Sequence, residues 1–154
     1  KSIVLPPNIF NIALSFSANT KISKILIPKS VGLCDVATFK NCVNLTSIVF
    51  EDGGDVPLYV GGDLWLENTQ VTILVLPFKT YRIRGYWRRG SNLNTLYVKS
   101  TIPPILEHGW GDNPDTCDLY VPIGCKEVYA SATNWGSFRT ITEYDFDLNP
   151  NNVH

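Results

Sequence analysis

The sequence predicts a β-rich α/β solenoid, a right-handed coil with a parallel sheet of about six short strands and a helical cap at its C-terminal end. Three observations predict this fold. Short β-rich triplets recur, and their first residues lie 22, 23, 26, 22 and 23 positions apart, a period typical of stacked structural repeats. One large aromatic residue recurs at a fixed phase between the triplets. The length of 154 residues fits about one domain.

The triplets predict the strands of the sheet. Successive side chains of a strand point to opposite faces, so the first and third residues of each triplet should face the core and the middle residue should face outward. A proline directly follows four of the triplets, where its missing N–H ends the ladder at little cost. The triplets occupy residues 3–5, 25–27, 48–50, 74–76, 96–98 and 119–121.

The aromatic residues lie nine positions before each strand from the second onward. They are Phe16, Phe39, Trp65, Trp87 and Trp110. We expect them to fill the space behind the sheet, where such a side chain buries ~150–250 Å². The alternative is a row of tryptophans that stack on carbohydrate, but an aromatic residue at the same phase in every turn is more often part of a core.

The repeats predict three parts of the chain. Residues 1–123 should form repeats of about 23 residues each, and residues 124–144 should form a capping helix and strand. In the capping part, Val128 and Ala132 have the i, i+4 spacing of one helix face. A solenoid needs an end that covers its last apolar face. The polar residues 145–154 should form a flexible tail.

Composition argues against several classes of function. Thirteen basic and 14 acidic residues give a net charge of −1, whereas a nucleic-acid binder needs a basic balance. The longest uncharged stretch contains two prolines and three asparagines, so this fragment should hold no membrane span. With only His108 and His154 and no glycine-rich phosphate loop, we expect no enzyme, no cofactor and no metal site.

The strand pattern L-x-x-L-x-L is the signature of leucine-rich repeats. Residues 25–50 (ILIPKSVGLCDVATFKNCVNLTSIVF) resemble the BspA-type repeat of bacterial surface proteins, and residues 96–105 and 119–138 resemble the C-terminal end of that family. The matching positions in the first segment are Pro28, Ser30, Val31, Ala37, Phe39, Cys42, Asn44, Leu45 and Ile48.

The resemblance implies a cell-surface or secreted protein of a gut or oral anaerobe of the Bacteroides kind. Such a protein would act in adhesion, by binding host extracellular-matrix proteins or other cells. Because the chain contains no methionine, we expect a fragment of a longer protein, with a signal or lipoprotein anchor upstream.

The four cysteines allow two disulfides or four buried thiols. No pair has C-x-x-C spacing, and buried thiols are favoured because Cys is among the most buried residue types. The resemblance places Cys42 at the buried Cys of the repeat and Cys34 at a position that is usually aliphatic and buried. A bond between Cys117 and Cys125 stays open.

The outward positions of the strands are the first candidate binding site. Stacked strands should align them into one apolar stripe, and such stripes tend to mark interaction sites. The candidates for contact with a protein partner are Leu26, Val49, Val75, Tyr97 and Tyr120, with Val4 at the head of the same row. The alternatives are that these residues serve strand propensity alone, or that the domain is an architectural spacer of a larger surface protein.

A basic segment, residues 79–89 (KTYRIRGYWRR), is the second candidate site. It holds Lys79 and four arginines between aromatic residues, and could bind an anionic ligand such as a glycan. The arginines are Arg82, Arg84, Arg88 and Arg89. The alternation at 81–84 suggests a short strand with its arginines in solvent, so a solvated edge is the alternative. Glu51, Asp52, Asp55 and Asp63 form an acidic group that could pair with this segment.

Overall fold

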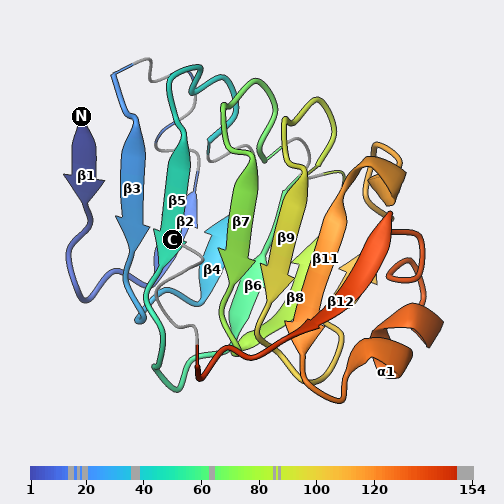
Figure 1. Cartoon of the computed structure of the whole chain (residues 1–154). Helices are drawn as coiled ribbons and strands as arrows, with labels where there is room; N and C mark the ends of the chain where they lie inside the picture. Colours follow the sequence, from blue (N-terminus) through green and yellow to red (C-terminus); the bar gives the residue numbers. More distant parts are fainter. Residues whose placement is uncertain are drawn as a thin grey trace.

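The computed structural model is a parallel β-solenoid of about six turns (Figure 1). It describes residues 1–13, 16, 18, 21–35, 39–62, 65–84, 86 and 88–148. Among these residues, helix is limited to α1 (Lys126–Ser131) and a single 3-10 turn, η1 (Pro114–Thr116). The predicted solenoid is therefore confirmed, but with so little helix it is a β-solenoid rather than an α/β one.

The recurrent triplets form the first sheet, which faces the viewer in Figure 1. Its strands are all parallel and lie in two ladders that meet where β5 runs beside β7. Five of the six predicted triplets lie within a strand, and the first does so except for Leu5, which follows the end of β1. The strands are β1 (Ser2–Val4), β3 (Lys24–Ile27), β5 (Ser47–Phe50), β7 (Ile73–Leu76), β9 (Thr95–Val98), β11 (Asp118–Pro122) and β12 (Thr140–Tyr144).

The return segments form a second parallel sheet behind the first, which the sequence analysis missed except for the short strand at 81–84. Its order is β10-β8-β6-β4-β2. Four of its five strands have only three residues, too few to show a clear alternation of apolar and polar side chains. The strands are β2 (Asn11–Ala13), β4 (Leu33–Asp35), β6 (Leu58–Val60), β8 (Thr80–Arg84) and β10 (Ile105–Glu107).

The core lies between the two sheets and contains the aromatic residues that the phase predicts. Phe39 and Trp65 are fully buried, and Trp110 is 4% exposed. The Phe39 ring lies 5.9 Å from Phe16 and 5.1 Å from Trp65, centroid to centroid. These residues confirm the core prediction, whereas Trp87, like Ala37 of the repeat motif, lies outside the described residues.

The four cysteines are buried as free thiols. Cys34 and Cys42 belong to the same core as the aromatic residues, as predicted. Burial raises the pKa of Cys34 to about 12 and the pKa of Cys117 to about 11. At neutral pH both groups are therefore neutral and unreactive.

The C-terminal segment packs against the last turns of the solenoid. β12 adds to the first sheet beside β11, and α1 follows β11 at that end (Figure 1). The buried Tyr129 of α1 donates a 2.7 Å hydrogen bond to the Ser100 carbonyl, and the Trp135 indole donates one of 2.9 Å to the Pro104 carbonyl. The aromatic rings of this segment are thus fixed by polar contacts as well as by packing.

The segment predicted as a flexible tail begins with a turn. Asp145 Oδ1 accepts hydrogen bonds of 3.0 Å from the backbone N–H groups of Asp147 and Leu148. Residues 149–154 lie outside the described residues. In the part of the chain that the structure describes, none of the helices has the length and apolar character of a membrane span.

Candidate functional site

The first sheet brings the predicted stripe together on its outer face. Val4, Leu26 and Val49 occupy the same register on β1, β3 and β5. Val75, Tyr97 and Tyr120 share a register on β7, β9 and β11. Val4 is 77% exposed and Val75 only 8%, while the other four are half-buried. The strand pairing thus aligns these side chains in two rows of three, one in each ladder.

The C-terminal half of the stripe is covered by residues that the sequence analysis did not assign to it. The Tyr97 and Tyr120 rings stack at 4.5 Å. Tyr144 packs edge-on at 5.2 Å from Tyr97, and Phe146 lies 5.0 Å from Tyr144. Partial burial, together with Tyr120 and Tyr144, raises the pKa of Tyr97. The chain therefore uses this half of the stripe for an intramolecular aromatic cluster.

The N-terminal half of the stripe stays open. A hollow of about 420 Å³ lies over β1, β3 and β5. Its walls are mostly aliphatic, and Lys24 and Ser2 contribute the polar groups at its border. The lining residues are Ser2, Ile3, Val4, Lys24, Leu26 and Val49.

The structure does not gather the four candidate arginines into one patch. Arg82 and Arg84 lie on β8, and Arg88 and Arg89 lie in the turn that follows. Arg88 is only 5% exposed. Its guanidinium donates hydrogen bonds of 2.8 Å to the Asn113 carbonyl, 2.9 Å to the Leu93 carbonyl and 2.8 Å to Thr116 Oγ1. Arg88 thus joins neighbouring turns and is withdrawn from the surface.

The other arginines differ in their contacts. Arg82 Nη2 lies 2.8 Å from Glu107 Oε1, and its guanidinium carbon lies 5.9 Å from the centre of the Tyr59 ring. Arg84 is exposed, and the nearby Tyr59 side chain raises the pKa of Arg84. Arg89 is exposed in its turn.

Among the described members of the acidic group, none forms the predicted ion pair with the basic segment. Asp52 Oδ2 lies 2.5 Å from Lys99 Nζ, and Glu51 Oε2 accepts a 3.1 Å hydrogen bond from the Lys29 backbone N–H. The Glu51 contact links neighbouring turns of the coil, whereas Asp52 and Lys99 follow β5 and β9 and lie two turns apart. Asp63 lies outside the described residues. Among those described, no three His, Cys, Asp or Glu side chains are close enough to hold a metal ion.

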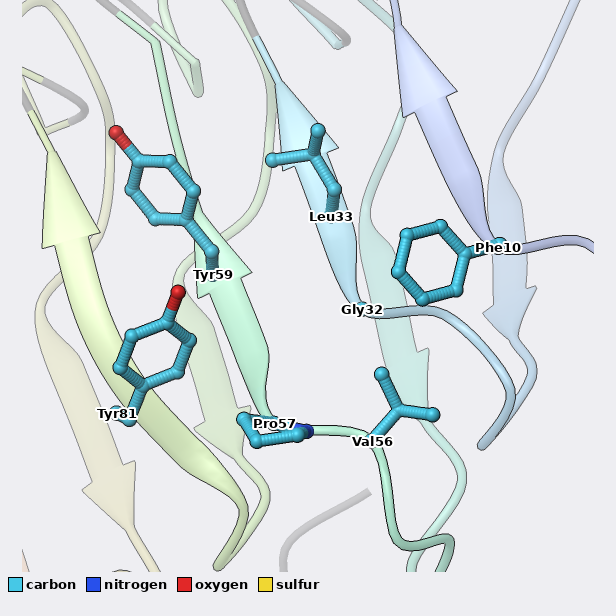
Figure 2. Close-up of a pocket in the computed structure, with 7 residues that line it drawn as sticks. All are labelled: Phe10, Gly32, Leu33, Val56, Pro57, Tyr59 and Tyr81. Atoms are coloured by element: carbon cyan, nitrogen blue, oxygen red, sulfur yellow. The ribbon is translucent and has the colours of Figure 1, made fainter.

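A second hollow, of about 390 Å³, lies on the outer face of the second sheet (Figure 2). It could not be predicted from the sequence because its walls come from four turns of the coil. Figure 2 shows Phe10 on one side, Tyr59 and Tyr81 on the other, and Leu33 between them. Gly32, Val56 and Pro57 complete the lining. We call this hollow the aromatic groove.

Comparisons with known proteins assign no family to the chain. A scan against models of protein families found no match, and a search of curated proteins found none either. Function is therefore inferred from the repeat pattern and from the two outer faces of the solenoid.

Proposed function

We propose that the chain is a leucine-rich repeat domain of the BspA type that acts as a non-enzymatic adhesion module at the cell surface or in the extracellular space. It binds a protein partner of the host matrix or of another cell through the outer face of the first sheet. In this proposal the segment 124–144 is the cap of the solenoid. The repeat residues 25–50 and the solenoid architecture support the family assignment.

One observation carries the binding proposal: the register that aligns Val4, Leu26 and Val49 along an open hollow. Exposed apolar side chains in one row favour burial against a partner, at roughly 25 cal/mol per Å² of apolar area removed from water. Ile73 is 49% exposed and extends the apolar area onto β7. An apolar centre with a polar border is the usual anatomy of a protein interface.

Surface plasmon resonance on immobilised fibronectin, laminin and collagen tests the proposal. Val4→Glu places a charge on a side chain that is 77% exposed, and Ile102→Glu makes the matched change at a residue that is 75% exposed in the turn after β9. We expect wild-type binding to at least one of these proteins, at least tenfold weaker for Val4→Glu and unchanged for Ile102→Glu. Equal binding by all three chains would contradict the site. If none of the matrix proteins binds, an architectural spacer is favoured instead.

A further inference from the structure

We propose that the aromatic groove of the second sheet binds a proline-rich peptide segment in the polyproline II conformation, with an acidic residue beside the prolines. This site is separate from the proposed binding face of the first sheet. Polyproline II segments dock into open grooves lined by aromatic side chains, because they are preformed and lose little entropy on binding.

The walls of the groove have the shape that such a segment needs. Phe10 is 57% exposed and Tyr81 is 47% exposed, so both rings are available to a ligand. The Tyr59 and Tyr81 rings lie 6.4 Å apart and are tilted by 53°. Adjacent strands lie ~4.8 Å apart, so the groove runs about 10–15 Å from β2 across β4 and β6 to β8. A polyproline II segment rises ~3.1 Å per residue, so this distance is long enough for two or three proline rings to lie against the lining.

Gly32 lets the floor of the groove form. A Cβ atom at this position would lie 2.6 Å from Val56 Cγ1 and 2.9 Å from the Phe10 ring. Both side chains therefore close over the glycine, and Figure 2 shows them on either side of it. Any larger residue would push Phe10 or Val56 out of place.

The rim of the groove offers hydrogen-bond donors to a peptide backbone. The hydroxyl groups of Tyr59 and Tyr81 point in the same direction in Figure 2, with the Tyr81 hydroxyl beneath the Tyr59 ring. The Arg84 guanidinium lies near the Tyr59 side chain, which raises the pKa of Arg84. A phenol hydroxyl can donate one hydrogen bond while its oxygen accepts another. Polyproline II carbonyls have no internal partners and can accept such a bond.

Charge near the groove favours an acidic neighbour of the prolines. Lys79 Nζ donates to the carbonyls of Lys29 and Val31, beside Gly32, and partial burial lowers the pKa of Lys79. The ion pairs of the described residues include Arg82 with Glu107 but neither Lys79 nor Arg84. After Tyr59, the carboxylates of Glu107 and Asp35 also raise the pKa of Arg84. Lys79 and Arg84 lie at opposite ends of β8, so an acidic residue that follows the prolines on the β8 side of the groove meets one or the other cation.

The lining favours a peptide over a sugar. Five of the seven lining residues, Phe10, Gly32, Leu33, Val56 and Pro57, carry no polar side-chain atom. A sugar would have to desolvate hydroxyl groups against this apolar wall without compensating hydrogen bonds. Proline rings carry no such groups.

Isothermal titration calorimetry with a capped decaproline peptide that ends in two glutamates tests the proposal, with the same peptide ending in two lysines as the charge control. We expect saturable binding, at least fivefold tighter for the glutamate peptide. Phe10→Ala and Tyr81→Ala should each weaken it at least fivefold. Phe78→Ala and Tyr86→Ala change equally exposed aromatic residues outside the groove and should leave it unchanged. Circular dichroism on each variant verifies that the fold is intact.

Three results would overturn the proposal. One is no binding of either peptide at millimolar concentration, and another is equal loss in the groove and control variants. The third is binding of tetragalacturonate, but of neither peptide, with loss in Phe10→Ala and Tyr81→Ala, which would make the groove a glycan site. Val4→Glu should bind the peptide normally, so the two proposed sites can fail independently.

Discussion

Removing the Arg88 side chain should lower the free energy of unfolding of the chain. It should change the exposed surface of the protein very little. The guanidinium is buried and makes three hydrogen bonds of 2.8–2.9 Å to Asn113, Leu93 and Thr116. Leu93 precedes β9, while the other two acceptors precede β11. Arg88→Ala would therefore disconnect neighbouring turns on that side of the coil.

The magnitude follows from the bonds that are lost. Hydrogen bonds to a charged group contribute ~1.5–3 kcal/mol each, and a carbonyl left buried without a donor costs ~1–3 kcal/mol. Removing the guanidinium also removes its own burial cost, which offsets part of this loss. We expect a loss of about 3 kcal/mol, or about 6–12 °C in Tm for a chain of this size.

Urea denaturation followed by tryptophan fluorescence measures this loss. Arg89→Ala is the matched control, since Arg89 is the next residue and is exposed, and it should stay within ~0.5 kcal/mol of wild type. Arg88→Lys should recover only part of the loss, because an ammonium cannot reproduce the fork of the guanidinium. A loss below ~1 kcal/mol for Arg88→Ala would refute the structural role.

Three further predictions concern other parts of the fold. The stacked pair Tyr97 and Tyr120 should give a coupling energy of ~0.5–1.5 kcal/mol in a double-mutant cycle to Ala, and additive losses would contradict the stacking. Gly54→Ala should destabilise the chain more than Gly109→Ala: both glycines have positive φ, but a Cβ at Gly54 would lie 2.5 Å from the Lys29 carbonyl oxygen, whereas Gly109 has open space. Because burial raises the pKa of Cys34 from 9.0 to about 12, its contribution to stability is fully present below about pH 9 and is lost as pH rises toward 12. The urea midpoint should therefore fall further between about pH 8 and about pH 10.5 in wild type than in Cys34→Ala. Equal falls in the two proteins would show that another group is responsible.

The first sheet could be predicted because its signal repeats. Each strand places an apolar residue at the same phase, so Ile25, Leu74 and Leu96 could be recognised as equivalent although no single triplet identifies a fold. The aromatic positions of Phe39 and Trp65 followed from the same period. A core that is built by repetition is visible in one dimension because every turn solves the same packing problem.

The second sheet was harder to predict because its strands are too short to show an alternation of apolar and polar side chains. Ile12, Cys34, Val60, Ile83 and Leu106 are its inward residues, and they recur at intervals of 22, 26, 23 and 23. That spacing was present in the sequence but involves chemically different residues. Arg88 could not be distinguished from Arg89 at all, because its acceptors are two backbone carbonyls and the Thr116 hydroxyl, which the fold alone brings together. The aromatic groove is likewise lined by residues that lie up to 71 positions apart in the sequence.

Because Tyr144 covers part of the stripe, not every substitution in the stripe can report on binding at the first sheet. Tyr97 and Tyr120 contact Tyr144, so replacing either tyrosine removes an internal contact before it removes any contact with a partner. Their loss should therefore appear first as a change in stability. Val4 is far more exposed and belongs to the open half of the stripe, so its substitution has no comparable internal cost. Reduced binding of Val4→Glu with an unchanged urea midpoint would thus identify a binding role that the tyrosine variants cannot isolate.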